Sequence, residues 1–393
     1  MRCSKNHLKR LAMKSVFLTL IPDGSLSFGS LKMDNSRTPT NVFVLTRIVP
    51  GRTDNSAIEN YTKGYCQGFV ESGLNVRFLQ LAAKNAVSDE SPFFYGFAKI
   101  RLLQFLIDFV RSLYFSISFM LRRDKCVLFV NNVARVDLPI LWIFRLLRYR
   151  CIIWVTDDYP ERREFTRSVV KKYADHAVAI NQYIAQDIKA PRDVHVFRGG
   201  GRGEYPTAIN QPKSGAPFSL FYAGKLNKLN AIDTILEIVS TSPETLSLAL
   251  FGDGPLLQTA QDYARHYPNI IVHGLKERTI VLDEMRQADA VLSVRTLEDD
   301  YYKGFFPSKL IEMLESPCQL IVTDMGLVTS GFENVAHLVD GSDVGSIKAA
   351  LKAAQTLSTE DAKTLSDNRR ILLAREFQWR LLADIVKNAG ART

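Results

Sequence analysis

The chain has 393 residues, which is long for a single hydrophobic core, so two domains are expected. Its 46% hydrophobic and 23% charged residues are typical of a globular protein and exclude a disordered one. The net charge of +9 favours an anionic partner, which could be nucleotide phosphates, a lipid surface or a nucleic acid. The sequence has neither zinc-finger spacing nor an RNA-binding aromatic signature, so we predict no nucleic-acid partner.

The cysteines are scattered and form no CxxC pair, which argues against both a zinc site and a disulfide framework. Reduced, buried thiols in a cytoplasmic protein are the favoured interpretation. The cysteines are Cys3, Cys66, Cys126, Cys151 and Cys318. Neither His176 nor His273 has another histidine or cysteine at metal-ligand spacing. We therefore expect both histidines to be structural, and we expect no metal and no cofactor.

Residues 1–40 are predicted to be a disordered N-terminal extension. The segment is basic, but its apolar run over 16–21 is short for a signal peptide and no small-residue cleavage site is clear. Met33 is an alternative start, because the first convincing strand begins shortly after it.

Strands and helices alternate over residues 41–200, which we predict to be an N-terminal Rossmann-like domain. The alternation is typical of a parallel sheet with helices on both faces. The expected strands lie at 42–45, 76–81, 127–130, 151–155, 177–180 and 195–197. The expected helices lie at 56–72, 138–147 and 165–173.

A stretch rich in glycine, proline and serine then interrupts the pattern, and residues 201–217 are predicted to be the linker between domains. A second alternating series over 218–370 predicts a C-terminal Rossmann-like domain. Residues 371–393 are predicted to be a C-terminal helical segment that packs back on the N-terminal domain, with one amphipathic helix over 370–387. The predicted fold class is α/β, with two doubly wound domains facing a central cleft that binds ligands at the carboxyl ends of the strands.

The most informative stretch runs from Phe306 to Asp324 and reads as a loop, a helix and a short strand. Pro307 is suited to a first helical turn, and Ser308 is a residue that caps free backbone N–H groups. Such groups attract an anion such as a diphosphate. Glu312 follows one turn later, where its carboxylate could accept hydrogen bonds from two sugar hydroxyls. The alternative interpretation is an ordinary capped helix with a solvated glutamate.

Five short motifs, taken in order, resemble the GT-B glycosyltransferases, specifically the family-4 group of retaining enzymes (glycosyl transferases group 1). The resemblance is best over residues 170–390, and only the order and spacing of the motifs make it specific. The motifs lie at 174–180, 222–226, 252–256, 306–312 and 323–324. The resemblance implies the GT-B architecture and a sugar transfer that retains the anomeric configuration without a metal.

The resemblance also implies which residues bind the donor. Lys225 replaces the family's diphosphate-binding arginine, and lysine keeps the charge but loses the bidentate fork. Asn230-Ala231 stands where the family has a later Lys-Gly pair. Gly304 stands where the family has the first glutamate of its Glu-x7-Glu motif. Glu298, Asp299, Asp300 and Lys303 are possible substitutes for that glutamate. The predicted donor-binding residues are Gly224, Lys225, Lys228, Gly252, Gly254, Gly274, Leu275, Pro307, Ser308, Lys309, Leu310 and Glu312.

On the acceptor side, many relatives carry a histidine after the fourth strand, and this chain has none there. The resemblance then passes the polar role, in acceptor binding or base catalysis, to Asp157, Asp158 or Glu161. A metal site at the two aspartates is disfavoured, because no other oxygen ligands converge there.

Residues 100–121 form an apolar stretch with a narrow polar stripe at helical spacing. Its three charges argue against a membrane-spanning helix. Two interpretations stay open: a buried core helix, or a helix lying on a bilayer surface. The second is supported by neighbouring basic residues, namely Arg122, Arg123, Lys125, Arg145, Arg148 and Arg150.

Together these features predict a metal-independent glycosyltransferase that moves a sugar from a nucleotide diphosphate donor to an acceptor hydroxyl. A lipid-linked saccharide in surface polysaccharide synthesis is the expected acceptor. The expected location is the cytoplasm, with peripheral binding to the inner face of the membrane. The alternatives are another GT-B enzyme, either a nucleotide-sugar epimerase or a phosphorylase, or a non-catalytic nucleotide-binding scaffold.

Overall fold

A computed structural model describes residues 19–20, 26–27, 41–46, 57–80, 126–188, 193–213, 215–297 and 299–391. Most of the predicted extension, the apolar stretch over 100–121 and Glu298 lie outside these ranges. Within the extension, β1 (Thr19–Leu20) pairs antiparallel with β2 (Leu26–Ser27). None of the helices in the described ranges is long and apolar enough to cross a membrane.

The N-terminal domain is built on a six-stranded parallel sheet in the order β4-β3-β5-β6-β7-β8. Its central strands are continuous apolar runs because helices cover both faces of a parallel sheet. The strands are β3 (Asn41–Thr46), β4 (Asn75–Gln80), β5 (Cys126–Asn131), β6 (Arg150–Val155), β7 (His176–Ala179) and β8 (Asp193–Val196). Covering one face are α4 (Leu138–Leu146), α5 (Pro160–Tyr173) and α6 (Gln182–Asp187), and covering the other are α2 (Ala57–Glu71) and α13 (Trp379–Ala391).

The C-terminal domain has a second six-stranded parallel sheet in the order β11-β10-β9-β12-β13-β14. The strand order reverses between β9 and β12, and such a switch point opens a crevice at the carboxyl ends of the strands. The strands are β9 (Phe218–Ala223), β10 (Leu246–Phe251), β11 (Ile270–Gly274), β12 (Ala290–Ser293), β13 (Gln319–Thr323) and β14 (His337–Val339). One face is covered by α7 (Ile232–Ser240), α8 (Leu257–His266) and α11 (Val344–Gln355), and the other by α9 (Arg278–Gln287) and α10 (Lys309–Leu314).

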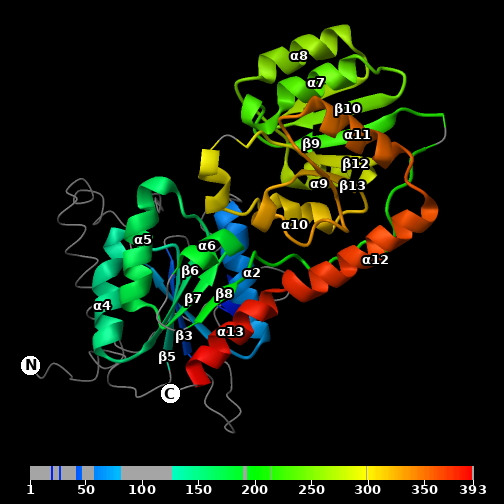
Figure 1. Cartoon of the computed structure of the whole chain (residues 1–393). Coiled ribbons are helices and arrows are strands. Elements are labelled where there is room, and N and C mark those ends of the chain that lie inside the picture. The colour runs from blue at the N-terminus through cyan, green and yellow to red at the C-terminus, as the bar shows by residue number, and fades with distance from the viewer. Residues whose placement is uncertain are drawn as a thin grey trace, which may run out of the picture.

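These two sheets confirm the predicted fold class of two doubly wound α/β domains. Figure 1 shows the domains facing each other, with α10 and α9 at the base of the second domain and α2 opposite them. The carboxyl ends of the strands of both sheets therefore border the space between the domains.

The predicted single helix over 370–387 is wrong, because two helices occupy this region. Helix α12 (Thr359–Glu376) ends with Phe377 as its C-cap, and α13 begins at Trp379. The chain breaks there because Phe377 packs against Phe306 and Phe332 of the second domain, whereas α13 packs against α2 in the first. The buried Phe377 carbonyl accepts a hydrogen bond from the Gly201 amide at 2.9 Å, which joins the break to the linker.

Trp379 anchors α13 on the N-terminal domain. A Cβ atom built on Gly64, Gly68 or Gly200 would come within 2.3–2.6 Å of Trp379 atoms, so the indole lies directly on these three backbones. Its ring also meets the fully buried Trp154 edge-on, with centroids 6.4 Å apart. Glycines on α2 and in the linker thus make room for the tryptophan that fastens the C-terminal helix.

Candidate functional site

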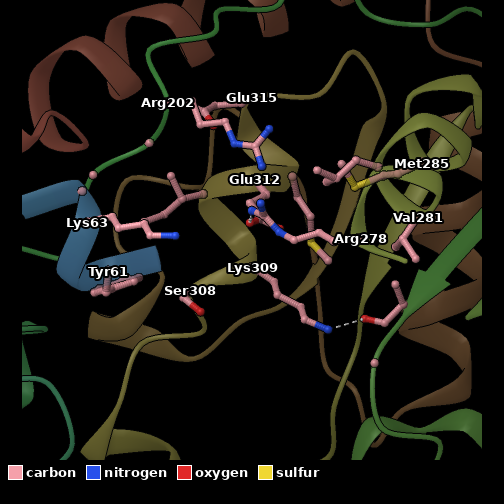
Figure 2. Close-up of a pocket in the computed structure, with 18 of the residues that line it drawn as sticks. Tyr61, Lys63, Arg202, Arg278, Val281, Met285, Ser308, Lys309, Glu312 and Glu315 are labelled. Carbon is pink, nitrogen blue, oxygen red and sulfur yellow. Dashed lines mark hydrogen bonds and ion pairs between the residues drawn. The ribbon is translucent and has the colours of Figure 1, made fainter. Parts of the chain in front are cut away.

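A cavity of about 910 Å³ lies between the two domains. Its walls come from α2, the linker, the ends of β9 and β10, the helices α9 and α10, and the start of α13. Figure 2 shows Tyr61 and Lys63 on one side of the cavity and Lys309 and Arg278 on the other. This volume is typical of a pocket for a small organic ligand.

The cavity is lined by more cationic than anionic side chains. The cations are Lys63, Arg202, Lys225, Lys276, Arg278, Lys309 and Arg380, and the anions are Glu71, Asp253, Glu312 and Glu315. An excess of three positive charges in a concave surface concentrates anions there.

Two predicted glycines shape the wall formed by the strand ends. The Gly224 amide donates to the Phe251 carbonyl at 2.9 Å, and the Gly252 amide donates to the Gly274 carbonyl at 2.8 Å. A Cβ on Gly252 would lie 1.8 Å from the Gly224 oxygen, so only glycine fits. Gly224 and Gly252 line the cavity, whereas Gly254 packs against the Leu226 backbone outside it. Leu275 is a further predicted residue that lines the cavity, and Gly274 is not among the lining residues.

Only one of the two predicted diphosphate lysines lines the cavity. Lys225 lies at the end of β9, and Lys228 is exposed outside the cavity. The Asn230 side chain, at the position of the family's later lysine, donates to the Lys225 carbonyl at 2.8 Å. Ala231 occupies the left-handed region at φ +50°, the conformation that suits the glycine found there in the family.

Glu312 forms an ion pair with Arg278, the first residue of α9. The two side chains are 33% and 38% exposed and point toward each other inside the cavity (Figure 2). No sequence motif marks Arg278, so it was not among the predicted site residues. A ligand hydroxyl that bonds to Glu312 would have to share this carboxylate with the guanidinium.

The expected amide cradle at the start of α10 is smaller than predicted. Ser308 has αR geometry and makes no capping hydrogen bond. The Leu310 and Ile311 amides donate to the Pro307 and Ser308 carbonyls, and proline has no N–H to offer. A tight turn therefore satisfies the Leu310 and Ile311 amides and leaves only the Ser308 and Lys309 amides without a backbone partner among the described residues. Because α10 has only six residues, its dipole is also weak.

The Lys309 side chain contributes charge to this part of the cavity. Its Nζ donates to the Ala223 carbonyl at 3.0 Å, the contact drawn in Figure 2. Burial lowers the pKa of the Lys309 ammonium, while the nearby Glu312 carboxylate raises it. Ser308, Lys309 and Glu312 line the cavity, but Pro307 and the buried Leu310 are not among its lining residues.

None of the three acidic residues predicted for the acceptor side lines this cavity. Asp158 is buried beside Arg163 at 3.4 Å, and burial raises the pKa of its carboxyl against the effect of that guanidinium. Asp157 is exposed and accepts a hydrogen bond from the Asn132 side chain at 2.8 Å. Glu161 is exposed in the first turn of α5.

Tyr61 connects Asp157 to the cavity electrostatically. Burial raises the pKa of its hydroxyl, and the negative charges of Asp157 and Glu312 raise it further. The hydroxyl donates to the Arg198 carbonyl at 3.1 Å. Of the three predicted acids, only Asp157 therefore acts on a residue that lines the cavity.

The segment around Gly304 is docked on the N-terminal domain. The Asp158 amide donates to the Gly304 carbonyl at 2.7 Å, and Asn181 donates to the Lys303 and Phe305 carbonyls at 3.0 Å each. A Cβ on Gly304 would lie 2.6 Å from the Asp158 oxygen. This close approach explains physically why glycine replaces the first glutamate of the family motif here.

Glu315 is a further cavity residue that the sequence analysis missed. Its carboxylate accepts a hydrogen bond from the Gly203 amide at 3.0 Å, which joins the end of α10 to the linker. Burial raises the pKa of Glu315 to about 7, against the lowering effect of backbone hydrogen bonds from Gly203 and Arg202.

The Glu315→Gln variant is expected to differ from the wild type in a pH-dependent way. A carboxyl whose pKa rises on folding stabilises the protein below its unfolded pKa, and this contribution is lost as pH rises through about 7. The glutamine variant should therefore be more stable than the wild type at pH 8 by about 1–2 kcal/mol, and similar at pH 4. Urea unfolding at both pH values measures the difference. Glu284→Gln, on the exposed side of α9, is the control, and an equal effect of Glu315→Gln at both pH values would contradict the prediction.

The two doubly wound domains with a charged cavity between them form the GT-B fold of glycosyltransferases. No protein-family model and no curated protein sequence matches the chain. Among solved structures, trehalose-6-phosphate synthase OtsA is similar, with a TM-score of 0.64 and 10% identity over 90% of this chain and 99% of the other. The apo form of the lipopolysaccharide outer core galactosyltransferase WaaB has a TM-score of 0.61 and 15% identity over 89% and 98%.

A third similar structure is Anabaena Alr3699/HepE in complex with UDP. It has a TM-score of 0.58 and 10% identity over 90% of this chain and 100% of the other. Identities this low show that the fold is shared. The predicted GT-B architecture is thereby confirmed, and the chemistry has to be argued from the cavity.

Proposed function

We propose that the protein is a glycosyltransferase that moves a sugar from a nucleoside diphosphate donor to an acceptor hydroxyl. The observation that carries this proposal is the cation-lined cavity between the two domains. Lys225 follows strand β9 of the second sheet, and Lys309 and Glu312 lie on α10. The nucleoside diphosphate leaving group carries a growing negative charge, and fixed cations in a partly closed cavity stabilise such a charge.

Each wall of the cavity has a distinct proposed role. Lys225 and Lys309 contact the diphosphate, together with the Ser308 and Lys309 amides, which make no backbone hydrogen bond among the described residues. Glu312 accepts hydrogen bonds from the ribose hydroxyls, and Arg278 releases this carboxylate to contact a phosphate oxygen. Closure of the domains over the donor excludes the water that would hydrolyse it. None of these steps requires a metal.

Uridine diphosphate is the first nucleotide to test. The similar HepE structure is described as a complex with UDP, and a similar trehalose-phosphate synthase is described as a complex with glucose-6-phosphate. These descriptions support a nucleotide donor and a sugar acceptor as the ligands of the cavity. Retention of the anomeric configuration is part of the proposal and is supported by the family resemblance.

A lipid-linked saccharide of surface polysaccharide synthesis is the proposed acceptor, met at the inner face of the membrane. Basic residues of the N-terminal domain, such as Arg145 and Arg148, support attraction to an anionic surface. The similarity to WaaB, described as a lipopolysaccharide galactosyltransferase, also supports it. Binding to anionic liposomes that high salt reverses would strengthen this part of the proposal, and indifference to such liposomes would count against it.

Two variants of the donor wall test the proposal. Lys225→Ala should weaken UDP binding by about tenfold or more, because a hydrogen bond to a charged group contributes about 1.5–3 kcal/mol. Glu312→Ala should lower the transfer rate by a similar factor through lost ribose contacts. Calorimetric titration with UDP and an assay of nucleoside diphosphate release in the presence of acceptor measure the two effects.

Lys228→Ala is a matched control, since this lysine is exposed outside the cavity three residues from Lys225. If neither Lys225→Ala nor Glu312→Ala changes binding or transfer relative to the control, the catalytic assignment fails and a scaffold role is favoured. Product that forms without an acceptor would indicate an epimerase. Sugar transfer without nucleoside diphosphate release would indicate a phosphorylase.

A further inference from the structure

Two histidines and an aspartate meet on one face of the N-terminal sheet, away from the cavity. Strands β7 and β8 run parallel, with His176 opposite Asp193 and Val178 opposite His195. Side chains two residues apart on a strand point to the same face. His176, Asp193 and His195 therefore share a face, and one ligand atom from each lies within 4.8 Å of the others.

The distances between these groups are close to those of a metal site. The His176 Nδ1 and Asp193 Oδ2 atoms are 3.6 Å apart, and the His176 and His195 ring centroids are 6.2 Å apart. Zinc binds imidazole nitrogen and carboxylate oxygen at about 2.0–2.2 Å in a tetrahedron, so two of its ligand atoms lie roughly 3.3–3.6 Å apart. Small rotations of the histidine rings would bring all three atoms to this spacing.

We propose that His176, Asp193 and His195 bind one divalent transition-metal ion, with zinc as the ion that fits best. Imidazole nitrogen is a ligand for zinc and its neighbours, whereas calcium and magnesium prefer sites made of oxygen alone. The His176 side chain is 8% exposed and that of Asp193 is 45% exposed. The ion thus binds between the buried His176 and the exposed Asp193. A water molecule on the solvent side is its fourth ligand.

The role of this ion is structural. His176 and Asp193 are the first residues of their strands, and the interdomain cavity lies beyond the carboxyl ends of these strands. Strand β8 is the edge strand and leads directly into the linker, so an ion bridging β7 and β8 fixes the strand from which the linker departs. His176 seemed to lack a partner in the sequence because His195 is 19 residues away and becomes its neighbour only through strand pairing.

Metal titration of the full-length protein tests this proposal after chelator treatment and removal of any histidine tag. Zinc should bind at one equivalent per chain and raise the melting temperature, and cobalt should give the visible absorption of a tetrahedral complex. His195→Gln and Asp193→Asn should each weaken zinc binding more than tenfold, since even loss of an outer-sphere partner costs about 10–100-fold.

His266→Gln is the matched control, because this exposed histidine lies on α8 in the other domain. It should bind zinc as the wild type does. Circular dichroism and UDP binding show whether each variant is folded, independently of the metal. The proposal is overturned if zinc does not saturate at one equivalent, or if His195→Gln and the control bind it equally. In either case, the contact between His176 and Asp193 is an ion pair only.

Discussion

Replacing Gly252 by alanine is expected to abolish nucleotide binding and to destabilise the C-terminal domain by about 2–5 kcal/mol. Gly252 has φ +128°, and its new Cβ would lie 1.8 Å from the Gly224 carbonyl oxygen. The clash is with backbone, so the ends of β9 and β10 must separate. That movement breaks the hydrogen bond from the Gly224 amide to Phe251 and displaces Lys225. Urea unfolding and calorimetric titration with UDP measure the two losses.

The Gly215→Ala variant separates the cost of the steric clash at Gly252 from the cost of placing alanine at a positive φ. Gly215 also has a positive φ, of +78°, but nothing lies within 4 Å of the position of its Cβ. Alanine there should cost only the left-handed backbone term of about 1–2 kcal/mol, with UDP binding unchanged. Equal losses in the two variants would show that crowding at Gly252 has no part in shaping the site.

The strands of the N-terminal sheet could be predicted from the sequence. Apolar runs such as residues 127–130 and 152–155 are buried on both faces of a parallel sheet, and this burial requires hydrophobic residues at every position. The strand boundaries differ from the predictions by one or two residues, as local pattern alone allows. The fold class followed from alternation with helices, which does not depend on exact boundaries.

The features that the sequence analysis missed depend on contacts between distant segments. The break after α12 arises because Phe377 packs against Phe306 and Phe332 of the C-terminal domain, whereas Trp379 packs on α2 of the N-terminal domain. The apolar pattern continues through the break, so it indicates one helix. Strand β14 has only three residues, and α6 has six, which is too short for a periodic signal.

The residues of the candidate site also divide into those that a sequence motif marks and those that only the fold brings together. Some site residues lie in motifs that follow a strand or begin a helix, and the order and spacing of these motifs make them recognisable. They are Gly224, Lys225, Gly252 and Glu312. Four other charged residues that line the cavity come from separate elements. They are Lys63 on α2, Arg202 in the linker, Arg278 on α9 and Glu315 at the end of α10. Only the three-dimensional fold brings these four together, and no local motif marks any of them.

Among the described residues, several contacts join the two domains besides the linker chain, and two of these places involve aromatic side chains. At one, Trp379 seats α13 on α2 beside the cavity. At the other, the segment 301–305 lies on the N-terminal domain, where Tyr301 stacks on Tyr159 with centroids 5.1 Å apart. A donor bound in the cavity would therefore be held between surfaces whose separation these contacts set. Because Gly304 lies against the Asp158 backbone, a side chain added at Gly304 would push the segment 301–305 away from the N-terminal domain.

Restoring the family's glutamate by Gly304→Glu is thus expected to lower sugar transfer rather than raise it. The first side-chain atom would lie 2.6 Å from the Asp158 carbonyl oxygen, so the segment must move away and lose the hydrogen bond from the Asp158 amide. A displacement of about 1 Å between reacting groups costs on the order of 100-fold in rate. The expected result is a loss of that size with little change in melting temperature, because the cores of both domains remain intact. Transfer assays and small-angle scattering measure the rate and the domain separation.

Asp300→Glu is the control for this change, since it lengthens an exposed acidic side chain in the same segment. It should leave both transfer and domain separation as in the wild type. A Gly304→Glu enzyme that transfers sugar faster than the wild type would mean that the cleft has room for the family's glutamate. The docked segment would then be one of several positions open to this loop, and the glycine would not be a steric requirement of the domain contact.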